Sequence, residues 1–188
     1  MKTLRDFHLP NMLRLLFILL MIQQVSFGQL KSKKDSLITD SSINLFAFVA
    51  QKISLNEFNA NVNYERPTSI EVDSTTGDTI MKRRSYIMDH AFEAKYKVIQ
   101  PVFNDLKTDT IVFNAYDHYG RPAFELYSTV LLYISKSEDG SYYFHQKYQF
   151  DPLYKTKNGS WTGKNGESLQ KLFKLKKKEV FKERGIFK

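Results

Sequence analysis

The chain of 188 residues contains no cysteine, and this absence excludes several classes of site. Without a thiol there can be no disulfide, no thiolate zinc site, no iron–sulfur cluster and no cysteine nucleophile. A bacterial lipoprotein is excluded as well, because its lipid is carried on a cysteine. Glycine and proline are also scarce, at 8 and 5 residues, and their scarcity excludes collagen-like and low-complexity chains.

The sequence motifs of common enzymes are missing too. The chain has no P-loop, no dinucleotide-binding glycine pattern, no HExxH zinc motif and no GxSxG nucleophile elbow. These absences predict a protein without a catalytic residue, a cofactor or a bound metal. What the chain does have is an ordinary globular composition, with 42% hydrophobic and 26% charged residues, and a high aromatic content of 14%.

The N-terminal 28 residues have the pattern of a secretory signal peptide. Basic residues precede the apolar run 15–22, and small residues stand at the −3 and −1 positions of a cleavage site after Gly28. A run of this length makes about 12 Å of helix, which is too short for a hydrocarbon core of ~30 Å. We therefore expect an exported protein, periplasmic or secreted, whose mature chain begins at Gln29. The alternative is an uncleaved anchor over residues 12–27.

The positive charge of the chain is confined to one segment. The formal net charge is +8, and it is +6 once residues 1–28 are removed. Residues 164–188 alone carry +6, so the stretch 29–163 is neutral. A neutral body argues against a nucleic-acid groove, which needs many distributed phosphate contacts, and no nucleic-acid partner is predicted.

Residues 164–188 have the pattern of a basic amphipathic helix. Its apolar residues fall on one face, Asn165 or Ser168 can cap its start, and Gly185 can end it. One interpretation is a terminal helix packed on the domain with a solvated lysine face. The other is a surface that binds anionic lipid, lipopolysaccharide or an acidic partner. In the second case the residues that contact the anionic surface are Lys174, Lys177, Lys178 and Lys182.

The stretch 43–163 has the pattern of a β-rich domain, preceded by a polar tether over residues 29–42. Its clearest signal is at residues 92–98, where apolar and polar side chains alternate as in a half-buried antiparallel strand. The other strand-like segments are 43–53, 69–72, 78–82, 108–116, 130–134 and 142–150. Strands joined by hairpins and followed by a helix predict a mainly β fold, either a small antiparallel barrel or a sandwich.

Two resemblances accompany this order of segments. Over residues 43–150 the pattern of strand, long excursion, two long strands, loop and hairpin resembles the OB-like barrel of netrin-like and metalloproteinase-inhibitor domains. Those inhibitors act through an N-terminal cysteine, which this chain lacks, so the resemblance implies a fold and no inhibitory residue. Residues 92–148, with the turn 116–122 inside them, resemble exported proteins of Bacteroidota, a resemblance that implies export and no activity.

The densest group of polar and aromatic side chains lies in the segment 116–124, directly after a predicted strand. One interpretation is a ligand site in which tyrosines stack and a guanidinium binds an anion. The other is an ordered turn in which a carboxylate accepts hydrogen bonds from backbone amides and Gly120 takes a positive φ. If the segment is a site, its ligand-binding residues are Tyr116, Asp117, His118, Tyr119 and Arg121.

These patterns favour a non-enzymatic exported protein whose β-domain binds a protein, peptide or glycan of the cell envelope. The first alternative is a module whose basic helix associates with anionic lipid or lipopolysaccharide. The second is a small hydrolase or metalloenzyme, which needs Asp117, His118 and His145 to converge at contacts of about 3 Å. The spacing of the histidines, His90 included, matches no metal-binding motif.

Overall fold

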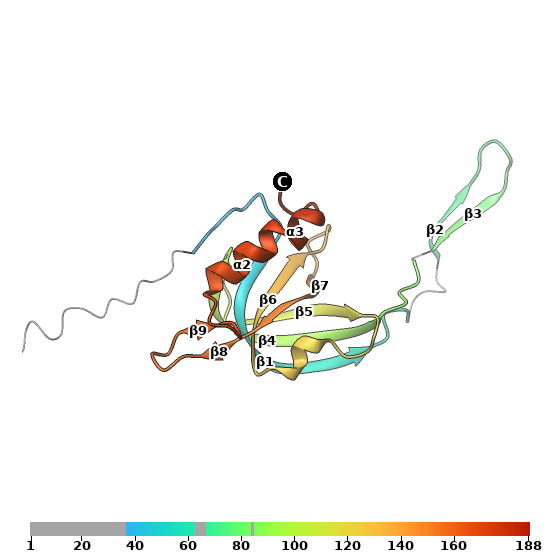
Figure 1. Ribbon diagram of the computed structural model, residues 1–188. Helices are drawn as coiled ribbons and strands as arrows, with labels where there is room; N and C mark the ends of the chain where they lie inside the picture. Colours follow the sequence, from blue (N-terminus) through green and yellow to red (C-terminus); the bar gives the residue numbers. More distant parts are fainter. Residues whose placement is uncertain (1–36, 63–66, 84) are drawn as a thin grey trace, which may run out of the picture. The chain divides into compact units, whose positions relative to one another are not determined.

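The computed structural model describes residues 37–62, 67–83 and 85–188 (Figure 1). The predicted signal peptide and most of the predicted tether lie outside these residues. No helix within the described ranges is both long enough and apolar enough to cross a membrane.

Five long strands form a closed barrel. They are β1 (Phe46–Phe58), β4 (His90–Phe103), β5 (Thr110–Asp117), β6 (Thr129–Lys136) and β7 (Tyr143–Pro152). Their order is β1-β4-β5-β7-β6, and neighbours are antiparallel except β5 and β7, which meet in parallel at Asn114 and Phe144. The contact is parallel because β6 reverses the chain between them, and it closes the barrel unevenly. The fold is therefore mainly β, as predicted, with a mixed sheet.

Two short hairpins complete the β-structure. The strands β2 (Pro67–Val72) and β3 (Thr79–Arg83) form a separate two-stranded sheet between β1 and β4 in the sequence. Gly77 in their turn has φ +77°, a conformation that glycine adopts without steric conflict. The second hairpin pairs β8 (Tyr154–Lys155) with β9 (Trp161–Thr162). The first of these hairpins confirms the pattern predicted from the sequence.

Two hydrophobic clusters lie on opposite faces of β6. The barrel cluster fills the interior and includes the rings of Phe92, Phe113 and Phe124. The outer cluster includes Leu131 and Tyr133. Since successive residues of a strand point to opposite faces, β6 is buried on both sides, which accounts for its unbroken apolar run. The strand predicted at residues 130–134 is confirmed here.

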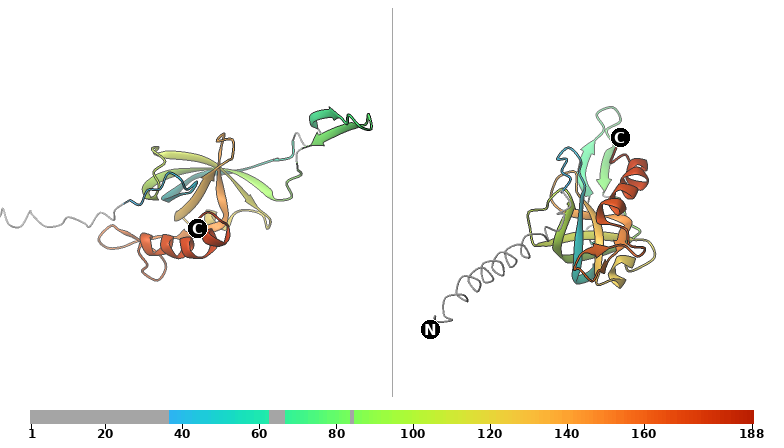
Figure 2. Two further views of the ribbon diagram at one scale, coloured as in Figure 1. Left: turned by 90° about the horizontal axis from the view of Figure 1, so that it is seen from above. Right: turned by 60° about the vertical axis from the view of Figure 1, so that its left-hand side comes forward.

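The C-terminal helices cover the outer cluster. The helix α2 (Leu169–Lys178) begins after Ser168, whose hydroxyl accepts a hydrogen bond from a backbone amide of the first turn at 3.3 Å. Glu179 interrupts the helix with ψ −105°, and α3 (Val180–Glu183) follows. Both helices lie along the outside of the barrel (Figure 2). Apolar side chains of both pack into the outer cluster. The helix predicted within 164–188 is confirmed in a shorter, interrupted form.

Residues 38–42, the last part of the predicted tether, are hydrogen-bonded to the barrel. The side chain of Asn104, just after β4, accepts a hydrogen bond from the Asp40 amide at 2.8 Å. It also donates to the carbonyls of Asp40, Ile43 and Leu45. Asn104 is buried and has φ +49°, which asparagine tolerates better than most residues. The ordered domain therefore begins upstream of the predicted boundary.

Candidate functional site

Strand β7 departs from regular pairing in its middle. His145 pairs with Ile134 of β6, but Phe150 pairs with Leu132, so residues 146–149 stand opposite a single residue of β6. Such an insertion is a large β-bulge, and bulges are frequent beside functional sites because they redirect side chains. We call residues 146–149 the β7 bulge.

His145 holds the β7 bulge from inside the barrel. Its Nε2 lies 2.8 Å from the carbonyl oxygen of Gln149, which can only accept, so Nε2 carries the proton and donates. The ring is 5% exposed and packs against Phe124, with 4.7 Å between the ring centroids. Burial lowers the pKa of His145 to about 4, so the imidazole is neutral near pH 7.

The C-terminal helices hold the β7 bulge from outside. The Arg184 guanidinium donates to Oε1 of Gln146 at 3.0 Å and to the carbonyl of Lys147 at 2.9 Å. Lys176 of α2 donates to Oε1 of Gln149 at 3.0 Å. Three of the four bulge residues are thus held by the C-terminal segment, so the geometry of the bulge depends on how that segment docks.

The fourth bulge residue, Tyr148, is exposed beside Tyr119. Its backbone has φ +66°, and its ring lies 6.4 Å from the Tyr119 ring at an interplanar angle of 33°. Nζ of Lys147 lies 5.2 Å from the centre of the Tyr148 ring, and the His118 ring lies 5.3 Å from that of Tyr119. Tyr119 is 87% exposed. We call His118, Tyr119, Lys147 and Tyr148 the tyrosine surface.

Asp89, just before β4, joins the charged groups of the tyrosine surface. Its Oδ2 accepts a hydrogen bond from Nζ of Lys147 at 2.6 Å, and its Oδ1 lies 3.4 Å from Nδ1 of His118. The hydrogen bond between Lys147 and Asp89 lowers the pKa of Asp89 and raises the pKa of Lys147. The pair therefore stays ionised near neutral pH and fixes the Lys147 ammonium over the Tyr148 ring.

A polar hollow of about 420 Å³ borders the tyrosine surface. It is lined by the end of β1 and the segment that leads into β4, and Asp89 belongs to its wall. His90 and Glu57, also in the wall, lie 3.0 Å apart between Nδ1 and Oε1. A tyrosine pair beside a polar hollow offers both stacking and hydrogen-bonding groups to one ligand.

The structure separates the predicted ligand-binding residues. His118 and Tyr119 are exposed and belong to the tyrosine surface. Asp117 is 8% exposed, and its Oδ1 accepts a hydrogen bond from the Tyr119 amide at 2.9 Å, so it shapes the turn. Tyr116 is half-buried, and its hydroxyl oxygen accepts a hydrogen bond at 3.5 Å from the side chain of Asn114, also in β5. Gly120 has φ +111°, as the ordered-turn interpretation expects.

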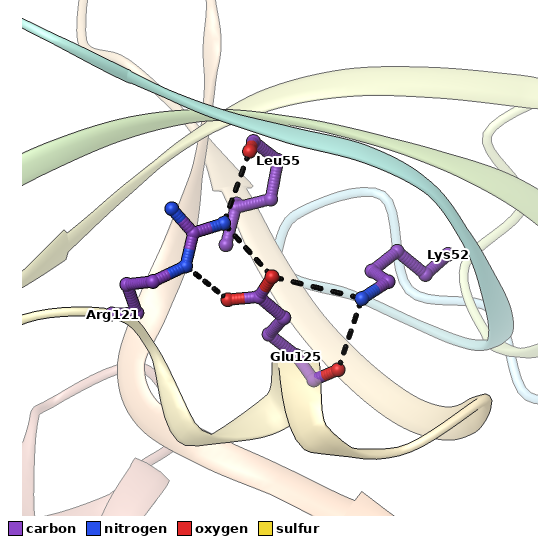
Figure 3. Close-up of polar contacts among 4 residues, drawn as sticks. All are labelled: Lys52, Leu55, Arg121 and Glu125. Carbon is purple, nitrogen blue, oxygen red and sulfur yellow. Dashed lines mark hydrogen bonds and ion pairs between the residues drawn. The ribbon is translucent and has the colours of Figure 1, made fainter.

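Arg121, predicted to bind an anion, forms an intramolecular ion pair with Glu125. Its Nε and one terminal nitrogen donate to the two carboxylate oxygens of Glu125 at 2.6 and 2.8 Å (Figure 3). That terminal nitrogen also donates to the carbonyl of Leu55 at 3.2 Å, and Nζ of Lys52 lies 3.6 Å from the same carboxylate. The bond from Arg121 lowers the pKa of Glu125, so the pair stays ionised. Arg121 thus attaches the turn to β1.

The alternative catalytic group of Asp117, His118 and His145 is not assembled. His145 faces the barrel interior, His118 faces Asp89, and Asp117 accepts from a backbone amide. Across the described part of the chain, no group of three or more His, Asp and Glu side chains is placed to hold a metal ion. Asp117, His118 and His145 thus each contact a different residue, and none of these contacts joins two of the three.

The positive φ of Tyr148 provides a test of strain at this site. Glycine at this position removes the conflict between Cβ and the backbone, whereas alanine keeps it, and both remove the ring. We expect Tyr148→Gly to be more stable than Tyr148→Ala by about 1 kcal/mol in urea unfolding. At Tyr154, which has no positive φ, the order should reverse. Equal stability of the two variants at position 148 would mean that the bulge holds no strain.

The sequence pattern predicts a plain returning strand over residues 142–150, and so it misses Lys147, Tyr148 and their partner Asp89. A signal was present, because the polar residues at 145–149 interrupt the apolar positions of the strand. Alternation alone does not separate such an interruption from a solvent-facing strand.

No protein-family model, curated protein or solved structure matches the chain. With no relative to compare, we base the functional interpretation on the tyrosine surface. It combines two exposed rings, a fixed ammonium group and a polar hollow. Its carboxylate and its ammonium group form an ion pair at 2.6 Å, which holds both side chains in place.

Proposed function

We propose that this chain is an exported, non-enzymatic binding module that contacts a protein, peptide or glycan of the cell envelope through the tyrosine surface. The observation that carries the proposal is the conformation of Tyr148. Its left-handed backbone is maintained by hydrogen bonds to its neighbours from the barrel interior and from the C-terminal helices. Strain of this kind persists only where the surroundings over-determine it, and such positions cluster at binding sites.

The chemistry of the tyrosine surface supports binding. Tyrosine offers a large rigid ring and a hydroxyl at low cost in conformational entropy, and it is enriched at recognition surfaces for that reason. Lys147 and Asp89 form an ion pair, so neither is a free acid or base. The proposal of export rests on the sequence pattern of residues 1–28.

A ligand selection with a matched depletion step tests the proposal. Phage-displayed random peptides and an array of glycans are presented to the parent protein, after depletion on the double variant Tyr119→Ala/Tyr148→Gly. The glycine keeps the backbone of the bulge and removes only the ring. We expect ligands whose Kd rises roughly tenfold or more for each single substitution, as for the hot-spot residues of other interfaces.

Tyr154→Ala is the matched control, because Tyr154 is as exposed as Tyr148, at 47% and 46%, but lies on β8. The selected ligands should bind this control as tightly as the parent. Thermal unfolding of each variant separates a loss of binding from a loss of fold. If the control weakens binding as much as the two site variants do, or if every ligand of the parent is removed by the depletion step, the partner surface lies elsewhere.

A further inference from the structure

One face of α2 and α3 carries a row of lysines. Because α2 buries Leu169, Leu172 and Phe173 in the outer cluster, its opposite face is directed to solvent. Spacings of three and four residues place the exposed lysines of α2 one above another, and one more exposed lysine follows on α3, beyond the interruption at Glu179. We call them the lysine face: Lys171, Lys174, Lys178 and Lys182.

None of these four lysines is in an ion pair within the described residues, although Lys171 interacts with the Glu167 carboxylate at longer range. Elsewhere in the described residues, four lysines form ion pairs with carboxylates at N···O distances of 2.6 to 3.6 Å: Lys52, Lys82, Lys107 and Lys147. Among the residues that the structure describes, no acidic side chain forms an ion pair with the lysine face. Like charges four residues apart on a helix, such as Lys174 and Lys178, repel each other and destabilise it. A bound anionic surface removes that repulsion.

Lys177, predicted from the sequence to contact an anionic surface, instead packs against an aromatic ring of the domain. Its Nζ lies 4.5 Å from the centre of the Phe187 ring, so its side chain packs on the domain. Lys171 lies on the outward face in its place. The set of residues that can contact a surface therefore differs by one position from the predicted set.

The lysine face also lies in the segment that carries the positive charge of the chain. Residues 164–188 carry +6, whereas residues 29–163 are neutral. The net positive charge that attracts a polyanion at long range is therefore concentrated in this segment. Its exposed row consists of compact ammonium groups, without the arginine forks and stacking rings that nucleic-acid recognition uses.

We propose that the lysine face binds the phosphate groups of an anionic lipid bilayer. From Lys171 to Lys178 the row is about 10 Å long at 1.5 Å per residue, so it can contact neighbouring headgroups together. Three apolar residues of α2 are already buried in the outer cluster, and Leu175, which is 44% exposed, is its one exposed apolar side chain beside the lysines. The contact is therefore mainly electrostatic and stays at the level of the headgroups. This site is separate from the tyrosine surface and does not rest on the function proposed for it.

Co-sedimentation with lipid vesicles tests this proposal. The purified protein is mixed at low salt with vesicles of phosphatidylcholine and phosphatidylglycerol, two to one. Each lysine held near such a surface strengthens binding by roughly fivefold, so replacing all four residues of the lysine face by glutamine should lower the partition coefficient by at least ~50-fold. Binding of the parent should also fade as salt shortens the Debye length from ~10 Å toward ~3 Å.

A charge-matched variant separates the lysine face from net charge. It replaces four exposed lysines outside the segment 164–188 by glutamine: Lys95, Lys97, Lys155 and Lys157. This variant should retain most of the parent's binding. Equal losses in the two quadruple variants, or no loss in the lysine-face variant, would overturn the proposal. Inorganic polyphosphate is the second probe, and a parent that binds it but does not sediment with the vesicles would show that the anion is a soluble one.

Discussion

Replacing Phe181 by alanine is expected to lower the free energy of unfolding by about 3–5 kcal/mol. The ring is 0% exposed and lies in the outer cluster, with its centroid 5.1 Å from that of Tyr133 in β6. It belongs to α3, which has only four residues and is too short to be stable by itself. The measured loss therefore reports how strongly the C-terminal helices belong to the core. In a domain of this size the melting temperature should fall by roughly 10–15 °C.

Leu175→Ala is the matched control for this prediction. Leu175 is an apolar residue of α2 that is 44% exposed, so its truncation should cost less than about 1 kcal/mol. If Phe181→Ala is no more harmful than Leu175→Ala, the helices are docked too loosely to support the barrel. The β7 bulge would then lose its outer support as well, because Arg184 follows α3 directly.

The fold class could be predicted because most strands leave a local pattern in the sequence. Alternation at residues 92–98 and the unbroken apolar run at 130–134 indicate which faces are buried, and the structure confirms both in β4 and β6. The C-terminal helix is predictable for the same reason, since its apolar residues recur with the helical period of 3.6 residues. The parallel contact of β5 with β7 was not predictable, because it depends on how the whole sheet curves and leaves no local pattern.

The candidate site could be predicted only where it coincides with a turn. His118 and Tyr119 are found because they lie in a dense polar segment after a strand, where functional residues are frequent. Lys147 and Tyr148 are missed because a bulge adds residues to a strand without adding turn residues around it. The two pairs meet only because β5 and β7 are neighbours in the barrel.

The structure gives Arg121 a partner that the sequence pattern does not indicate. Its partner Glu125 stands only four residues further along, a spacing that brings side chains together in a helical turn. The short helix η1 (Ala123–Leu126) supplies that turn, and it is too short to leave a periodic pattern in the sequence. A guanidinium next to tyrosines therefore resembled an anion site, although its counter-ion was nearby in the same segment.

His145, which closes the β7 bulge from inside, also determines a pH dependence of stability. In the folded protein, burial lowers its pKa to about 4, against an ordinary value of 6.5 in the unfolded chain. Between these two values the unfolded state binds a proton that the folded state does not. Stability is therefore highest above the unfolded pKa and falls as the pH falls toward the folded pKa. The carboxylates whose pKa is lowered by ion pairs, such as Asp89 and Glu125, lose their contribution only at lower pH.

We expect the parent protein to lose about 2.5 kcal/mol of stability between about pH 7 and about pH 4.5, as measured by urea unfolding at a series of pH values. The variant His145→Gln keeps a side-chain donor for the Gln149 carbonyl but has no titratable ring. Its stability should be nearly constant over this range, so the difference between the two proteins should change by the same 2.5 kcal/mol or so. Parallel stability curves would contradict this prediction. They would mean that the His145 ring takes up a proton in the folded state, and so that water reaches the ring while the barrel stays folded.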